Sequence, residues 1–408
     1  MKLIEKFSKT ALIVGAALLM TACGGDDADT PPVAQAPAPV VVAGSATGTL
    51  TDAAVGGVAY TTSSGVAGTT AADGSYQYNP GDTVTFKLGA LTLGTATATG
   101  IVTPMELSGG SAVVLQNLLV LLQSLDSDRN PANGITIPAG AAAAVTASAN
   151  LSGSTSTFAA DSGVQAAMTA GGISGSPTSN AMAGEHFVSQ GLALLSRNIW
   201  VNQSTDSGGQ THTVILRIDA SGRYTQIETG ASESVGGETV ASSGVEAGTL
   251  TVAGFSPQGY NVTATIASDS NGAWGASSLQ ACDRFRNVGE QLVTSDCESS
   301  RGLFGKMPNV DTAVTGAWYV EFLDDGELNA MESYYFPNGS FVVTYYKPNC
   351  AEACASEARS GTYALADGMI TTTVDGRTSR AMTYSLSADG KQLVIDGRTE
   401  RTMARVSR

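Results

Sequence analysis

The sequence DASGRY at residues 219–224 recurs as FPNGSF at residues 336–341, and in both a glycine follows a turn-forming residue and precedes a strand-like run. Five further matches keep the same order: IWV 199–201 with AWY 317–319, EAGTL 246–250 with RSGTY 359–363, VTATI 262–266 with ITTTV 370–374, GEQLV 289–293 with GKQLV 390–394, and FGKM 304–307 with MARV 403–406. The spacing falls from 118 residues (200 to 318) to 99 (304 to 403), as loop insertions and deletions would cause. Six ordered matches indicate an internal duplication of about 100 residues.

Each copy opens with a tryptophan-bearing strand and closes on an apolar–basic–apolar strand. This layout resembles the small lipocalin-like antiparallel barrels of bacterial envelope proteins. The resemblance implies two β-units, residues 198–308 and 309–408. The duplication predicts that residues 198–307 and 314–407 superpose strand for strand, with Trp200 and Trp318 at equivalent buried positions. About six strands a unit lies near the lower limit for barrel closure, so one larger barrel built from both units is the alternative.

The sequence before the duplication changes in composition twice. Residues 46–105 are strand-like, and TVTFKL at 83–88 alternates as a half-buried strand should. They resemble the carboxypeptidase-regulatory or collagen-adhesin B-type β-sandwich modules of bacterial surface lipoproteins, which implies a spacer or adhesive stalk. Residues 106–197 favour helices, including a long buried one at 113–125 and others at 139–149, 157–169 and 180–197. The predicted fold is therefore mainly β and multidomain: a small β-sandwich, a helical middle segment and two lipocalin-like antiparallel β-barrel units.

The N-terminus predicts export. Three lysines precede an apolar run at 11–20 that is too short to span a bilayer, as in a secretory signal. LMTAC at 19–23 resembles a bacterial lipobox, which implies removal of residues 1–22 and acylation of Cys23, so the lipid bilayer is an expected partner. An ordinary signal peptide with an incidental cysteine is the alternative. Gly24 after the cysteine implies the outer membrane, facing either the periplasm or the surface, and residues 23–45 form a Pro/Ala-rich tether.

Charge and motifs exclude several function classes. The formal net charge is −15, which argues against nucleic acid as a partner because phosphate binding needs a basic face. The sequence contains no nucleophile elbow, phosphate-binding loop or zinc-protease motif, so we expect no enzymatic activity.

Four cysteines follow the signal: Cys282, Cys297, Cys350 and Cys354. An even number in an exported chain predicts disulfides. Of the three pairings, Cys282–Cys297 with Cys350–Cys354 requires no long-range closure. Zinc is disfavoured because the cysteine spacings match no zinc motif.

One loop suggests a cation. Asp126, Asp128 and Asn130 resemble the first half of a calcium loop, in which alternate side chains direct oxygens to one point. Pro131 and Ile137 depart from that pattern. The alternative is that Asp126 ends a helix and the remaining polar side chains bond the local backbone of turns. No other cofactor is expected.

The sequence is compatible with three functions. The first is a non-enzymatic, adhesion-like interaction role in the cell envelope, with an unknown surface as partner. The second is a carrier of a small apolar ligand inside the β-units, which an unfilled barrel interior would favour. The third is an accessory module of polysaccharide degradation, which a row of exposed aromatics would favour. Tyr345 and Tyr346 are the candidate ligand-binding aromatics, although aromatics in such units more often form the core.

Overall fold

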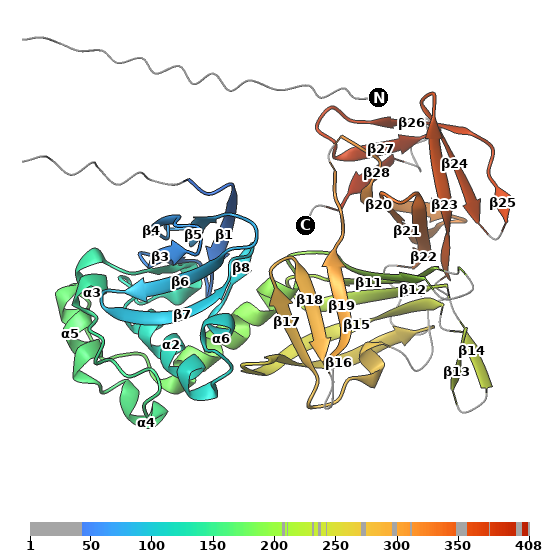
Figure 1. The fold of residues 1–408 in the computed structure, drawn as a ribbon. Helices are drawn as coiled ribbons and strands as arrows, with labels where there is room; N and C mark the ends of the chain where they lie inside the picture. Colours follow the sequence, from blue (N-terminus) through green and yellow to red (C-terminus); the bar gives the residue numbers. More distant parts are fainter. Residues whose placement is uncertain are drawn as a thin grey trace, which may run out of the picture. The chain divides into compact units, whose positions relative to one another are not determined.

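The computed structural model describes residues 43–205, 209, 211–230, 232–235, 238–241, 243–270, 275–295, 300–310, 312–347, 357–374, 376–396 and 402–406 (Figure 1). It confirms the predicted fold class, since these residues form two closed antiparallel barrels, several small sheets and a helical segment. None of the helices in these ranges is both long and apolar enough to cross a membrane. The expected signal peptide and Cys23 lie outside the described residues.

Two small sheets are built from the first strands, in the orders β5-β1-β8 and β4-β3-β6-β7. The strands of these sheets are β1 (Ala46–Leu50), β3 (Ala59–Thr62), β4 (Ala67–Thr69), β5 (Ser75–Tyr78), β6 (Thr83–Leu88), β7 (Leu91–Thr97) and β8 (Ile101–Val102), and β2 (Val55–Gly56) lies in neither of them. TVTFKL forms β6, with Val84, Phe86 and Leu88 buried, as its alternation predicts. Phe86 packs edge-on against Tyr76 of the other sheet, with ring centroids 5.3 Å apart. Apolar side chains of both sheets therefore share one core.

The helical segment packs on that same core. Its elements are α1 (Pro104–Leu107), α2 (Ala112–Ser124), η1 (Pro131–Asn133), β9 (Ile135–Thr136), α3 (Ala139–Ala144), α4 (Thr155–Phe158), α5 (Ser162–Ala170) and α6 (Asn180–Leu195). Helix α2 is buried almost throughout its second half, as its apolar sequence predicts. It begins where the Ser111 hydroxyl accepts a hydrogen bond from the Val114 amide at 3.3 Å. Strand β9 pairs in parallel with β2 and so joins the segment to the sheets.

The helices predicted at 139–149 and 157–169 are shorter than expected. Helix α3 ends at Ala144 because Val145 is extended, with ψ 118°, and its carbonyl accepts the Ala90 amide at 3.1 Å. The second helix is divided into α4 and α5 at Asp161, whose carboxylate caps α5 by accepting the Gly163 amide at 2.7 Å. Contacts with the sheet and a capping side chain thus set the helix ends.

The first β-unit forms a closed eight-stranded barrel, which we call barrel 1. Its strands in order are β10 (Trp200–Thr205), β11 (Thr211–Ile218), β12 (Arg223–Thr229), β15 (Gly244–Ser256), β16 (Gly259–Asp269), β17 (Arg284–Val288), β18 (Gln291–Ser295) and β19 (Ser300–Lys306). The hairpin β13 (Ser232–Val235) and β14 (Glu238–Ala241) and the short helix η2 (Ala276–Ser278) are inserted between strands. Strand β10 pairs with β19 and closes the ring.

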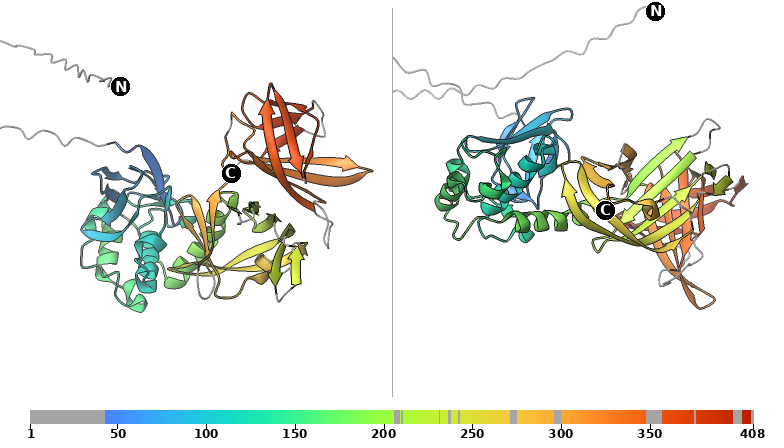
Figure 2. Two further views of the ribbon diagram at one scale, coloured as in Figure 1. Left: turned by 45° about the vertical axis from the view of Figure 1, so that its right-hand side comes forward. Right: turned by 90° about the horizontal axis from the view of Figure 1, so that it is seen from below.

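The second β-unit forms barrel 2, also with eight strands in its ring. They are β20 (Gly316–Asp324), β21 (Glu327–Tyr335), β22 (Ser340–Tyr346), β23 (Glu357–Ala366), β24 (Met369–Val374), β26 (Met382–Leu386), β27 (Gln392–Ile395) and β28 (Thr402–Arg405). Strand β24 pairs with both β23 and β26, so the ring closes, and β25 (Arg377–Thr378) lies outside it. The estimate of six strands and the alternative of one larger barrel are both wrong. Figure 2 shows both barrels in two further views.

The two barrels repeat each other strand for strand. Trp200 and Trp318 are both fully buried and lie on the first strand of their barrels, opposite Lys306 and Arg405 of the last strands. The indole N–H of each donates to a backbone carbonyl at 2.7 Å, of Leu195 and of Val314 respectively. The predicted equivalence of the two tryptophans is therefore confirmed, and the matching strand order agrees with the predicted duplication.

A pair of glycines repeats as well. Gly248 and Gly361 occupy matched positions, and a Cβ atom there would lie 2.1 and 2.0 Å from a neighbouring carbonyl oxygen. Each lies opposite an aromatic residue on the adjacent strand, Tyr224 or Phe341. Only glycine allows the backbone to approach so closely, and the aromatic ring covers the space left by the missing side chain.

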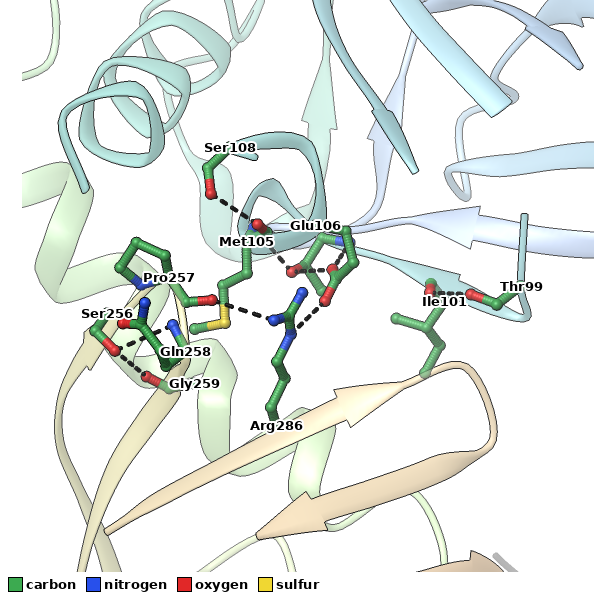
Figure 3. Close-up of polar contacts among 11 residues, drawn as sticks. Thr99, Ile101, Met105, Glu106, Ser108, Ser256, Pro257, Gln258, Gly259 and Arg286 are labelled. Carbon is green, nitrogen blue, oxygen red and sulfur yellow. Dashed lines mark hydrogen bonds and ion pairs between the residues drawn. The ribbon is translucent and has the colours of Figure 1, made fainter. Parts of the chain in front are cut away.

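Barrel 1 is attached to the helical segment by an ion pair (Figure 3). The Arg286 guanidinium on β17 donates from Nε to Glu106 Oε1 at 2.9 Å and from Nη1 to the Pro257 carbonyl at 3.3 Å. The other Glu106 oxygen accepts the Thr103 amide at 2.7 Å, which completes a capping box on α1. The Glu106 carboxylate thus caps α1 and binds strand β17 of barrel 1.

The outer faces of the two barrels share a separate apolar cluster. It consists of Ile199, Ile215, Ile227, Val245 and Met307 of barrel 1 with Ala317, Tyr334, Phe336 and Val342 of barrel 2. Within this contact, Arg217 forms a 2.6 Å ion pair with Glu332, which is fully buried. The hydroxyls of Tyr334 and Tyr346 also donate to the Glu332 carboxylate, the latter at 2.6 Å. The carboxylate is therefore hydrogen-bonded on both oxygens.

Candidate functional site

The interior of barrel 1 is the candidate site, and strand β11 shows how the sequence creates it. Successive side chains of a strand point to opposite faces. Ile215 and Arg217 face barrel 2, so Val214 and Leu216 face the barrel interior. The same alternation on β12 turns Tyr224, Gln226 and Glu228 inward.

A cavity of about 670 Å³ lies inside barrel 1. This volume falls in the range of small-molecule pockets, roughly 300–1,000 Å³. Six of the eight strands and η2 contribute to its wall. The apolar lining residues with the larger side chains are Val214, Leu216, Leu250, Leu279, Phe285 and Phe304, and the longer polar ones are Gln226, Glu228, Gln280 and Asp283.

Some inward positions of barrel 1 carry smaller side chains than in barrel 2. Leu250, which lines the cavity, and Ile218, which does not, match Tyr363 and Tyr335 of barrel 2 in the duplication. In barrel 2 these tyrosines pack edge to face, with ring centroids 5.1 Å apart, and Tyr335 also stacks on Phe341 at 5.9 Å. In barrel 1 the inward side chains of Val214, Gln226 and Phe304 stay half-exposed.

A buried carboxylate forms hydrogen bonds on the polar side of the cavity wall. Glu246 is fully buried, and its Oε1 accepts the Tyr224 hydroxyl at 2.6 Å and the Ala276 amide at 2.9 Å. Burial, and then the hydrogen bond to Glu246, raise the pKa of Tyr224, so its hydroxyl keeps its proton and donates. The bond to Ala276 holds η2 in the wall of the cavity.

Helix α6 covers one end of the barrel. The carbonyls of Leu194 and Leu195 in its last turn accept the Asn287 amide group at 3.0 Å and the Trp200 indole N–H at 2.7 Å. Because both donors lie on barrel strands, the helix end is hydrogen-bonded directly to the barrel. This end of the barrel is therefore packed, and none of these four residues lines the cavity.

The predicted ligand tyrosines lie in barrel 2, outside this cavity. Tyr345 is 41% exposed and shares the inward face of β22 with Phe341 and Val343. Tyr346 points to the opposite face and binds Glu332. The two neighbours thus face opposite sides, and a ligand role for either stays a prediction.

The predicted calcium residues have local partners. Asp126 is buried, and its Oδ1 accepts the Thr136 amide at 3.0 Å. Asp128 accepts the Asn130 amide at 3.0 Å and the Asn133 side-chain amide at 2.8 Å. Among the described residues, no three acidic, histidine or cysteine side chains gather into a metal-binding group. These bonds are those of the turn alternative, and calcium binding stays a prediction.

Of the cysteines, Cys282 is described and is disulfide-bonded. Cys297, Cys350 and Cys354 lie outside the described residues. The pairings Cys282–Cys297 and Cys350–Cys354 therefore stay predictions.

Sequence reasoning did not identify the cavity residues Gln226, Glu228 and Asp283. The signal available was on β12, where Tyr224, Gln226 and Glu228 alternate with Ile227 on the opposite, apolar face. Polar side chains on the inward face of a barrel strand indicate a site rather than a packed core.

Comparisons with known proteins identify no family. No family model matches the chain, and no curated protein matches it. A search of solved structures finds a weak likeness to a DNA polymerase sliding clamp from Pseudomonas aeruginosa, at 9% identity and a TM-score of 0.10. The match covers 48% of this chain and 58% of the clamp, so the chain spans less than two thirds of that protein. A likeness this weak carries no argument about fold or function.

Proposed function

We propose that barrel 1 binds a small, largely apolar molecule in its interior. The observation that carries this proposal is the cavity of about 670 Å³, with apolar walls and a few polar groups. Small barrels otherwise fill themselves with side chains, so an unfilled interior favours a ligand. Among the exposed large apolar side chains of the described residues, Tyr345 is the one aromatic, which does not favour a polysaccharide-binding row. The adhesion-like role stays a prediction from the sequence.

A neutral, environment-sensitive dye such as N-phenyl-1-naphthylamine tests this function. We expect saturable binding of one dye per chain, and Val214→Trp should weaken it at least about tenfold because the indole occupies the cavity. Leu303→Trp is the matched control, since Leu303 lies on the barrel strand β19 but is 51% exposed. Fluorescence titration measures both. Equal binding by the two variants would place the dye elsewhere and contradict the proposal.

We also propose that Cys23 anchors this binding module to the outer membrane. The support is the lipobox-like LMTAC and the Pro/Ala-rich sequence that follows it. Cys23→Ser should move the protein from the membrane fraction to the soluble periplasmic fraction and abolish incorporation of labelled palmitate. Leu303→Trp, at an exposed position, is the control that keeps the lipobox and the disulfide of Cys282 intact. Palmitate incorporation into Cys23→Ser would show that Cys23 is not the acylated residue.

A further inference from the structure

The charged residues that line the cavity all have one sign. Glu228 and Asp283 are among the lining residues, and the described part of the lining contains no lysine, arginine or histidine. Fully buried Glu246 lies just behind the wall, bonded to the lining residue Ala276. Wall charges of one sign act strongly in a low-dielectric interior, where they attract the opposite charge and repel their own.

Asp283 has unused hydrogen-bonding capacity. Its side chain is only 2% exposed, and its Oδ2 accepts the Gln280 amide at 2.7 Å. Its Oδ1 has no hydrogen-bond partner among the described residues. The Arg284 guanidinium bonds the Ala281 and Asp283 carbonyls instead of this carboxylate. A buried carboxylate oxygen without a donor is costly unless a charge or donor reaches it.

A metal ion fits this wall poorly. Hard cations need several oxygen ligands at one point, and the described acidic side chains form no group of three that could hold one. The cavity is also far larger than an ion, and Leu216, Leu250 and Phe285 give it broad apolar walls. An organic cation with an apolar body matches both the size and the lining.

From these observations, and resting on the ligand-binding function proposed above, we infer that barrel 1 selects apolar ligands that carry a protonated amine. The carboxylates of Asp283 and Glu228 receive the ammonium N–H groups, and the apolar wall receives the hydrocarbon. Apolar ligands that carry a carboxylate are disfavoured by the same charges.

Three twelve-carbon displacers of the bound neutral dye test this inference: dodecylamine, dodecanol and dodecanoate, each below its micelle concentration. We expect dodecylamine to displace the dye at a concentration at least about tenfold lower than dodecanoate, with dodecanol between them. Asp283→Asn should weaken the binding of dodecylamine by about tenfold and leave the binding of dodecanol unchanged. Glu228→Gln is a second variant at the half-buried carboxylate, and it should act in the same direction.

Glu290→Gln is the matched control. Glu290 belongs to the same barrel, is 73% exposed and pairs with Lys306, so this variant changes the net charge equally without touching the cavity. Equal displacement by all three compounds, or an amine preference that survives both cavity variants, overturns the inference while dye binding stands. Failure of the dye to bind in the barrel overturns the proposed function and the inference together.

Discussion

Replacing Arg217 by alanine is expected to lower the free energy of unfolding by about 3 kcal/mol. The substitution leaves the Glu332 carboxylate buried between the barrels without its cationic partner. Although burial opposes the charge on Arg217, Glu332 outweighs it and raises the pKa of the guanidinium, so Arg217 stays charged at every accessible pH. Urea unfolding followed by tryptophan fluorescence measures the loss.

Arg223→Ala is the control for this prediction. Arg223 forms a 2.9 Å ion pair with Asp219 on the same barrel, but its side chain is 77% exposed. Exposed pairs contribute little, so the expected loss is below about 1 kcal/mol. The double variant Arg217→Met with Glu332→Leu removes both charges and should lose less stability than Arg217→Ala, although the Tyr334 and Tyr346 hydroxyls lose their acceptor. Equal losses for Arg217→Ala and Arg223→Ala would mean that the buried ion pair contributes no more to stability than the exposed one.

Replacing Asp52 by asparagine is expected to stabilise the protein above neutral pH. Asp52 is fully buried, and burial raises its pKa from 3.8 to about 7, against the opposing hydrogen bond from Gln123. The folded chain therefore retains a proton that the unfolded chain has released between about pH 4 and pH 7. The free energy of unfolding of the wild type consequently falls as pH rises through this window.

Asparagine does not ionise, so the stabilising effect should grow from near zero at about pH 4 to about 4 kcal/mol at about pH 8. His186 lies 3.8 Å from Asp52, and burial lowers its pKa. Burial holds the pKa of nearby Tyr260 well above its usual range, so its hydroxyl stays neutral. Both groups remain in the variant, so the difference from the wild type isolates Asp52.

Urea midpoints of variant and wild type across this pH range measure the difference. Asp73→Asn is the control, because Asp73 is exposed and its hydrogen bonds with Ser75 lower its pKa instead. Its variant should gain no stability as pH rises. A pH-independent difference for Asp52→Asn would show that this carboxyl is ionised in the fold at low pH as well.

The fold was largely predictable because the sequence motifs that indicate it occur twice in the chain. Matched motifs around Trp200 and Trp318 indicated two copies, and the alternation at residues 83–88 indicated a strand. The number of strands was underestimated because short strands such as RFRNV in β17 carry little apolar pattern, with Phe285 as the one large buried apolar side chain. Strand β26 (MTYSL) does alternate, since Met382, Tyr384 and Leu386 pack on the core of barrel 2. Strands β17 and β26 pair with β16 and β24 through two residue pairs each, and these pairings cannot be read from the sequence.

The candidate site was less predictable, since a cavity depends on the summed size of side chains that meet from distant strands. Leu250 looks like an ordinary core residue in sequence. The space beside it becomes apparent only on comparison with Tyr363, which occupies the matched position of barrel 2 and packs against Tyr335. Asp283 lies in a connection between strands, where sequence gives no indication of burial.

Barrel closure lowers the tendency of this chain to aggregate with its own copies. An open sheet ends in a strand with free N–H and C=O groups, which can recruit a strand from a second molecule and begin aggregation. Each of the sixteen ring strands here has a hydrogen-bonded neighbour on both sides. Neither ring therefore offers a terminal strand as a template, and a crowded layer of such molecules is protected from strand-by-strand association through these rings.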